Sequence, residues 1–132
     1  MIGLDSNVLL RFFVEDDVTQ TARAVDLITR RISEHDPGFI SIVVLVETIW
    51  NLTRNYEFSH DQLVTTLKYL LSSDSLILQH EEQVAAALLT VEDGLGSFPD
   101  ALIASLGMAA KCTTTYTFDR KAARLPGFTL IQ

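Results

Sequence analysis

Short apolar runs alternate along the chain with longer stretches in which apolar residues recur every three or four positions. The short runs predict strands at residues 2–4, 39–40, 76–78, 112–118 and 128–131. The longer stretches predict helices over residues 8–13, 20–32, 42–53, 60–71, 81–93 and 99–111. Strands that alternate with helices are typical of a parallel sheet covered by helices. The pattern therefore predicts an α/β protein in which helix clearly exceeds strand.

Short polar side chains mark where several of these helices begin, because they can accept a hydrogen bond from the free N–H groups of the first turn. Thr19 or Thr21 is suited to cap the second helix, and Ser41 is suited to cap the third. Ser59 and Gln62 have the spacing of a capping box, in which both side chains bind backbone N–H groups. These residues predict the starts of three helices.

Length and composition fit one folded domain. The chain has 132 residues, of which 48% are apolar, so a packed core is expected. No segment rich in proline, glycine or serine separates one part from another, and we predict one domain over residues 1–132. The single cysteine, Cys112, excludes an intrachain disulfide and a zinc site built from cysteines.

Charge and hydropathy exclude further classes of protein. The apolar helical stretch 101–110 is about half as long as a membrane span. The first residues lack the basic and apolar regions of a signal peptide. A net charge of −7 argues against nucleic-acid binding through a broad basic surface. A role on RNA or DNA therefore requires a local site or a bound cation.

Most of the 17 acidic residues stand among polar residues and need no special explanation. Asp26, for example, has the helical spacing to pair with Arg23 and with Arg30. Four acids differ because they stand at the end of a predicted strand or next to long apolar runs. They are Asp5 and Asp119 after strands, Asp100 before an apolar helix, and Glu47 inside the apolar helix 42–53, where we predict that it is buried.

Each of these acids has a structural alternative. Asp5, Asp100 and Asp119 all stand where a carboxylate can stabilise the start of a helix or turn. Glu47 in a buried helix requires a partner, and Arg11 is the candidate for a buried ion pair. Taken singly, none of the four acids distinguishes a structural role from a chemical one.

Taken together, the four acids indicate a metal site. The carboxyl ends of parallel strands meet at one edge of a sheet, where ligands bind in open α/β folds. Carboxylates gathered there repel one another unless a cation lies between them, and Mg²⁺ or Mn²⁺ prefers ligands that are all oxygen. An open site of this kind suits metal-assisted hydrolysis of phosphodiester bonds. The cation also explains how an acidic protein can act on an anionic substrate.

At these residues the sequence resembles the PIN-domain nucleases, and within them the VapC-type ribonuclease toxins of toxin–antitoxin pairs. The resemblance covers nearly the whole chain and rests on four motifs in order. The motifs are Leu4-Asp5-Ser6-Asn7-Val8-Leu9-Leu10-Arg11, Val46-Glu47, Phe98-Pro99-Asp100-Ala101-Leu102-Ile103-Ala104 and Thr117-Phe118-Asp119-Arg120. The family usually has threonine where Ser6 stands, so the hydroxyl is kept.

The resemblance implies a three-layer α/β/α sandwich with a central, mainly parallel sheet and a Mg²⁺- or Mn²⁺-dependent endoribonuclease. It implies that Asp5, Glu47, Asp100 and Asp119 form the catalytic metal site, with Asp5 and Asp100 as direct ligands. Ser6, Asn7 and Thr117 are expected to support the carboxylates by hydrogen bonds. The candidate phosphate contacts are basic residues near these acids, namely Arg11, Arg120, Lys121 and Arg124.

The resemblance also implies partners and a cellular setting. We expect an RNA substrate, a small antitoxin protein, a homodimer and a cytoplasmic location without membrane attachment. One alternative is a PIN-like module that binds RNA or protein without catalysis, although four intact acids argue against it. Another alternative is a Mg²⁺-dependent receiver or phosphatase-like domain. Such domains require a further acid near the first strand, and here Ser6 and Asn7 follow Asp5.

Overall fold

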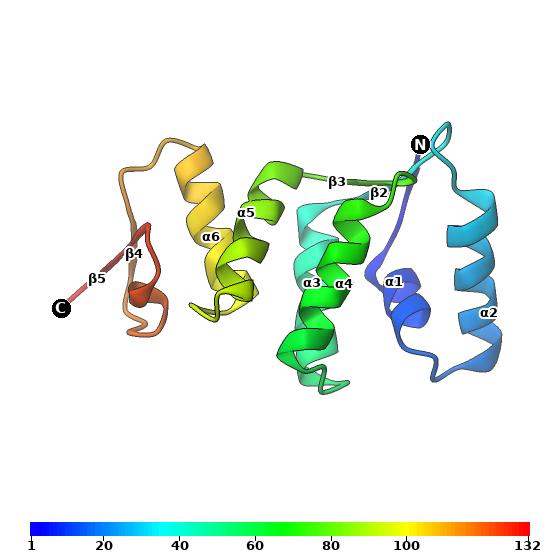
Figure 1. The fold of residues 1–132 in the computed structure, drawn as a ribbon, viewed down its shortest axis with the longest axis horizontal. Helices are drawn as coiled ribbons and strands as arrows, with labels where there is room; N and C mark the ends of the chain where they lie inside the picture. Colours follow the sequence, from blue (N-terminus) through cyan, green and yellow to red (C-terminus); the bar gives the residue numbers. More distant parts are fainter. The chain divides into compact units, whose positions relative to one another are not determined.

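The chain forms two compact units, Met1–Gln79 and His80–Gln132, in a computed structural model that describes residues 1–132 (Figure 1). Each unit contains its own parallel sheet. The prediction that residues 1–132 form a single domain stays a prediction. None of the helices is long and apolar enough to cross a membrane.

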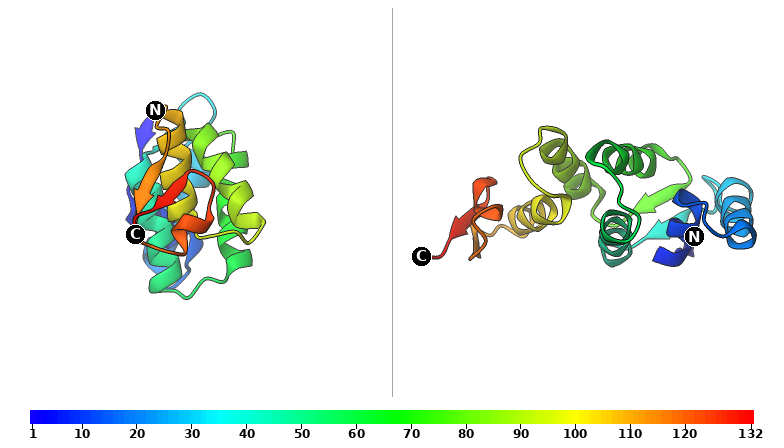
Figure 2. Two further views of the ribbon diagram at one scale, coloured as in Figure 1. Left: turned by 90° about the vertical axis from the view of Figure 1, so that its left-hand side faces the viewer. Right: turned by 90° about the horizontal axis from the view of Figure 1, so that it is seen from below.

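The first unit is a three-stranded parallel sheet with helices between successive strands. The strands pair in the order β1-β2-β3, and Ile2 lies opposite Gly38 while Phe39 lies opposite Ile77. In the right-hand view of Figure 2, the helices of this unit are seen end-on around the strands. Its elements are β1 (Ile2–Gly3), α1 (Ser6–Phe13), α2 (Val18–Asp26), a π-helical turn (Leu27–Arg31), β2 (Gly38–Ile40), α3 (Ile42–Arg54), α4 (His60–Ser72) and β3 (Leu76–Leu78).

The second unit pairs two helices and a small parallel sheet. Helices α5 and α6 pack against each other along their length, and β4 pairs in parallel with β5, with Thr115 opposite Phe128. A connection that contains a 3₁₀ turn leads from β4 to β5. The elements are α5 (Glu81–Glu92), α6 (Phe98–Ala109), β4 (Thr115–Thr117), a 3₁₀ turn (Ala122–Arg124) and β5 (Phe128–Leu130).

Most of the predicted elements and caps are confirmed. Ser41 accepts a hydrogen bond from the N–H of Val44 at 3.2 Å and begins α3. Ser59 and Gln62 form the capping box of α4 in both directions, with distances of 3.2 and 2.8 Å. In both helices the cap satisfies N–H groups that have no partner within the helix, and the helix therefore starts at the predicted position.

Two predicted boundaries are wrong. Asp17, rather than Thr19 or Thr21, caps α2, because its carboxylate accepts from the N–H of Gln20 at 2.9 Å. The strand predicted over 112–118 shortens to β4 because Cys112 still donates to the carbonyl of Gly107, at 3.0 Å, and completes the end of α6. The local sequence pattern predicted that α2 and β4 exist. Their first residues depend on which side chains and carbonyl groups bind the nearby backbone N–H groups.

The sheet of the first unit leaves no room for a side chain at Gly38. A Cβ atom at this position would lie 2.9 Å from methyl groups of both Leu4 and Ile32. Ile40, two residues further along β2, is fully buried, as are Leu9 of α1 and Leu67 of α4. The core of this unit therefore packs around the central strand and holds the residues after β1 and β2 in place.

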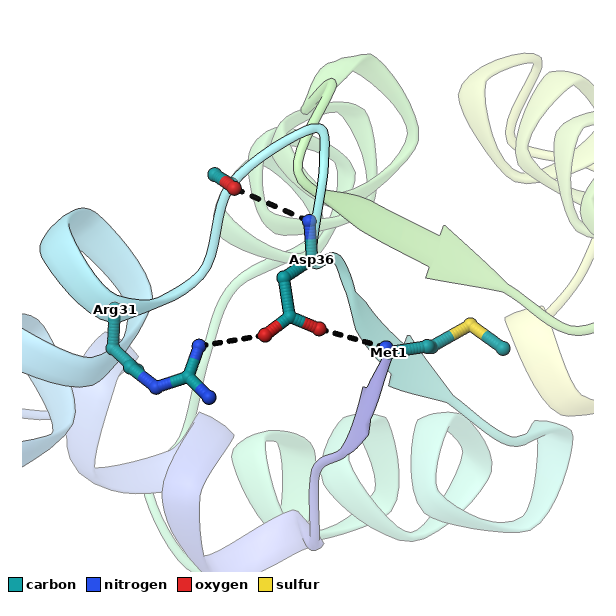
Figure 3. A network of polar contacts seen from close by, with 4 residues as sticks. Met1, Arg31 and Asp36 are labelled. Atoms are coloured by element: carbon teal, nitrogen blue, oxygen red, sulfur yellow. Dashed lines mark hydrogen bonds and ion pairs between the residues drawn. The ribbon is translucent and has the colours of Figure 1, made fainter.

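A charged network fixes the edge of this sheet (Figure 3). The Met1 amine donates to one oxygen of Asp36 and the Arg31 guanidinium donates to the other, each at 2.7 Å. The hydrogen bond from the Met1 ammonium, followed by that from Arg31, lowers the pKa of Asp36 to about 2. The network ties the first residue before β1 to the turn that precedes β2.

Replacing Asp36 with asparagine is expected to lower the melting temperature slightly at pH 7, because the carboxylate is partly exposed and water screens its ion pairs. The folded pKa of about 2 lies below the unfolded value of about 4. The stabilisation is therefore complete above pH 4 and is lost as the pH falls toward 2. Thermal unfolding of wild type and variant from pH 7 to 3 measures it. Asp26→Asn, at an exposed i,i+4 pair with Arg30, is the control, and a difference that is constant over this range would contradict the prediction.

Candidate functional site

Asp5 lies two residues after the carboxyl end of β1 and is the N-cap of α1. Its Oδ1 atom accepts a hydrogen bond from the N–H of Ser6 at 2.8 Å. No group of the protein donates to its Oδ2 atom, and the residue is exposed. Asp5 therefore caps α1, as its structural alternative predicts, and the cap uses only one of the two carboxylate oxygens.

Ser6 forms hydrogen bonds to the carboxylate of Asp5 and to that of Glu47. Its side chain is buried, and its hydroxyl donates a short hydrogen bond to Oε1 of Glu47 in α3. Glu47 also keeps one oxygen, Oε2, without a donor from the protein. The backbone N–H and the hydroxyl of one buried serine thus orient the carboxylates of Asp5 and Glu47. The predicted role of Ser6 in a metal site stays a prediction.

Glu47 is exposed, and the prediction that it is buried is wrong. The face of α3 that packs into the core consists of Leu45, Thr48, Ile49 and Leu52. Glu47 lies on the other side of the helix, with Val43 and Trp50, which are 70% and 50% exposed. The five residues before Glu47 in this helix are all apolar and so occupy every side of it, and the sequence therefore could not show which side faces the core.

The buried ion pair between Glu47 and Arg11 is also absent. Arg11 instead donates to Asp16 at 2.9 Å and to the side chain of Gln20 at 2.6 Å. Desolvation lowers the pKa of Arg11, but Asp16 and Tyr56 outweigh it and raise the pKa above its ordinary value. Arg11 therefore connects α1 to the start of α2 through these contacts. Its contact with substrate phosphate stays a prediction.

Asp100 lies in the first turn of α6, in the second unit. Ser97 caps this helix by accepting from the N–H of Asp100 at 3.3 Å, and Pro99 suits the first turn because it has no N–H group that would need an acceptor there. The carboxylate of Asp100 is half-buried and makes no hydrogen bond or ion pair. Because Ser97 caps α6, the helix does not need the carboxylate of Asp100, and both of its oxygens are available to a ligand.

Asp119 follows β4 and stabilises the next turn. Its Oδ1 atom accepts from the N–H groups of Lys121 and Ala122, at 2.8 and 3.4 Å. Thr117 accepts from the N–H of Asp119 at 3.0 Å, so its hydroxyl supports the backbone of this acid rather than its carboxylate. The capping alternative for Asp119 is therefore present, and Oδ2 remains without a donor.

The predicted site residues are thus distributed over both units. The first unit brings Asp5, Ser6 and Glu47 together, and the second contains Asp100, Thr117 and Asp119. Within neither unit do three or more His, Cys, Asp or Glu side chains gather into a group that could hold a metal ion. The first unit therefore supplies a pair of oriented carboxylates.

This pair fits a hard divalent cation in the chemistry of its donors. Both side chains offer a carboxylate oxygen that no protein group occupies, and the buried Ser6 fixes the oxygen beside it. Oxygen ligands with room for water are what Mg²⁺ and Mn²⁺ require. Asp5 and Glu47 are therefore the residues of the first unit that would hold such an ion.

The remaining candidate contacts lie at the surface. Asn7 is exposed on α1, and Arg120, Lys121 and Arg124 are exposed on the turn after Asp119. None of the four side chains makes a hydrogen bond or ion pair. They are free to contact a ligand, and their roles stay predictions.

Sequence analysis missed one polar residue of the first unit. Arg23, which we interpreted as a partner of Asp26, makes no ion pair, and Asp26 pairs with Arg30 alone at 3.4 Å. Arg23 instead lines a groove between α1 and α2, together with Asn7 and Arg11. No signal in the sequence pointed to this groove, because it depends on how two helices pack.

Comparison with known families completes the description of the site. The model of the PIN domain family matches residues 2–127, a range that contains all four predicted acids and every strand except β5. Among curated proteins, none matches the chain with significant similarity. PIN domains are generally metal-dependent nucleases, and the match confirms the predicted α/β/α fold class with its parallel strands. The chain therefore belongs to the PIN domain family.

Proposed function

We propose that this protein is a metal-dependent endoribonuclease, and specifically the VapC-type toxin of a toxin–antitoxin pair. The observation that carries the proposal is the pair of carboxylates that Ser6 orients at the end of β1. A protein that only needed to cap α1 would gain nothing from a second carboxylate held beside the first. The family match supports nuclease chemistry, and the four motifs support the choice of RNA.

In this proposal Asp5 and Asp100 bind Mg²⁺ or Mn²⁺ directly, and Glu47 and Asp119 bind a second ion or orient water. When bound, the cation supplies positive charge that favours ionisation of the attacking water and stabilises the leaving oxygen. Ser6 holds Asp5 and Glu47 in one orientation, so their oxygens need not reorganise during the reaction. Thr117 steadies the backbone at Asp119, and Asn7 is proposed to support the carboxylate of Asp5 by a hydrogen bond.

The proposal extends to substrate and partners. Arg11, Arg120, Lys121 and Arg124 would attract RNA phosphates to a chain that is otherwise acidic. A small antitoxin would bind through an apolar segment and neutralise the acids, and the active form would be a cytoplasmic homodimer. Each of these statements depends on the resemblance to VapC-type toxins.

Incubation of a total-RNA pool with the purified protein tests the proposal. We expect discrete fragments with Mg²⁺ or Mn²⁺ and none with EDTA, because the acids alone repel phosphate. Asp100→Asn should abolish cleavage without unfolding the protein, since Ser97 rather than Asp100 caps α6. Asp93→Asn, at an exposed acid of the same unit, is the matched control.

Two results would contradict the proposal. Cleavage that persists in EDTA would show that the reaction does not require the cation. Intact RNA under all conditions, from folded protein without a bound antitoxin, would favour a PIN-like module that binds without catalysis. Formation of phosphoaspartate at Asp5 with a small phosphate donor would instead favour a receiver or phosphatase-like domain.

A further inference from the structure

A groove of about 280 Å³ lies between α1 and α2 of the first unit. It begins at Asn7, two residues after Asp5, which corresponds to about 3 Å along the axis of α1. The groove and the carboxylate pair of Asp5 and Glu47 therefore belong to the same unit and share the start of α1. A ligand in the groove would lie along the helix that begins at Ser6, which orients the carboxylate pair.

The lining of the groove has an apolar part and a cationic part. Val8 from α1 and Ala24 and Leu27 from the α2 region provide the apolar surface. Two arginines, Arg11 and Arg23, provide the charge, and no carboxylate lines the groove. This is unusual in a chain with 17 acidic and 10 basic residues. The lining therefore complements a ligand that combines an anionic group with an apolar surface.

The two arginines differ in what they can offer. The guanidinium of Arg11 is already bound to Asp16 and Gln20, which leaves little of its charge uncompensated. Arg23 has no hydrogen bond or ion pair within the protein. An arginine without a partner at the edge of a groove is free to bind a phosphate with two hydrogen bonds.

We propose that this groove binds one nucleotide of single-stranded RNA, with its phosphate on Arg23 and its base on Val8, Ala24 and Leu27. This inference rests on the proposed nuclease function. A nucleotide has both parts that the lining complements, since each base has a flat face that packs on apolar and guanidinium surfaces. The side-chain oxygen of Gln20 accepts from Arg11, and its NH₂ group is available to donate to the edge of the base.

The size of the groove favours a nucleotide over a protein segment. A helix with its side chains is about 10 Å wide, and ligand sites for small molecules begin at about 300 Å³. A groove of about 280 Å³ is close to this lower limit and suits one small group better than a helix packed along its length. The groove would act on specificity, because the base that it holds must fit its lining.

Titration with the 5′-monophosphates of adenosine, guanosine, cytidine and uridine tests this inference without any need for cleavage. We expect at least one of them to shift the NMR signals of Asn7 and Arg23. Arg23→Gln should weaken this binding about tenfold, because one charge-assisted phosphate contact is lost. Arg30→Gln is the matched control, since Arg30 is exposed and pairs with Asp26 outside the groove.

Cleavage kinetics provide the second measurement. Arg23→Gln should raise KM for RNA about tenfold and leave kcat unchanged, because the residue binds substrate away from the reacting atoms. Unchanged KM and unchanged nucleotide binding in Arg23→Gln would overturn the inference while leaving the nuclease in place. Nucleotide binding that depends on Arg23, in a protein that cuts no RNA, would support the groove and refute the proposed nuclease. Loss of binding to a co-purified antitoxin, with nucleotide binding intact, would make the groove a protein-binding site and overturn the inference.

Discussion

Replacing Asp5 with asparagine is expected to lower the rate of RNA cleavage by about 100-fold or more while the protein stays folded. The side-chain oxygen of asparagine can still accept from the N–H of Ser6, so the cap of α1 is retained. The negative charge is lost, and with it the attraction for a divalent cation. Loss of about 3 kcal/mol of transition-state stabilisation corresponds to this change in rate. Single-turnover cleavage and thermal unfolding of the same samples measure both quantities.

Asp26→Asn is the control for this variant because it removes one carboxylate from an exposed ion pair in the same unit. It should leave cleavage and melting temperature near those of the wild type. Full activity in Asp5→Asn would mean that the carboxylate only caps α1 and that the reaction does not depend on it. If both activity and fold are lost, binding of Mn²⁺ to Asp5→Glu, which keeps the charge, separates the two roles.

Leu67→Ala should lower the free energy of unfolding by about 2–5 kcal/mol, the range for leucines in well-packed cores. Leu67 lies in α4, is fully buried, and belongs to the helix that packs on β3. Removing its side chain leaves a cavity that neighbouring residues cannot fill without moving the sheet. Denaturant unfolding at neutral pH gives the change in midpoint and slope.

The matched control is Leu89→Ala, which makes the same chemical change on the surface of α5. Leu89 is 65% exposed, so we expect an effect within about 0.5 kcal/mol. Equal effects of the two substitutions would show that burial does not determine the cost, which would contradict the packing described for the first unit. A loss in Leu67→Ala smaller than 1 kcal/mol would lead to the same conclusion.

Capping residues explain why so much of the fold could be predicted. Ser41, Ser59 and Ser97 each accept from the N–H group three residues onward, and the helices α3, α4 and α6 begin beside them. Gly94, with φ of 71°, follows α5 in the left-handed conformation that glycine adopts without strain. These contacts span at most a few residues, and therefore a local pattern of sequence suffices to predict them.

The errors concern choices between neighbours that have similar local signals. Three polar residues near the start of α2 are suited to cap it, and the backbone selects Asp17 over Thr19 and Thr21. Helix α3 is apolar on nearly all sides, so only its packing showed that Leu45 faces the core and Glu47 does not. Neither choice could be made without the positions of the other elements.

The sequence by itself determined the α/β class, the order of helices and parallel strands, the family, and the acids on which the proposed chemistry depends. These depend on spacing along the chain and on contacts within a single turn. Only the tertiary structure decided that Ser6 joins Asp5 to Glu47, that Arg11 binds Asp16, and that Arg23 lines a groove. Each of these depends on which faces of two helices meet, because the free energy of packing comes from surfaces distant in sequence.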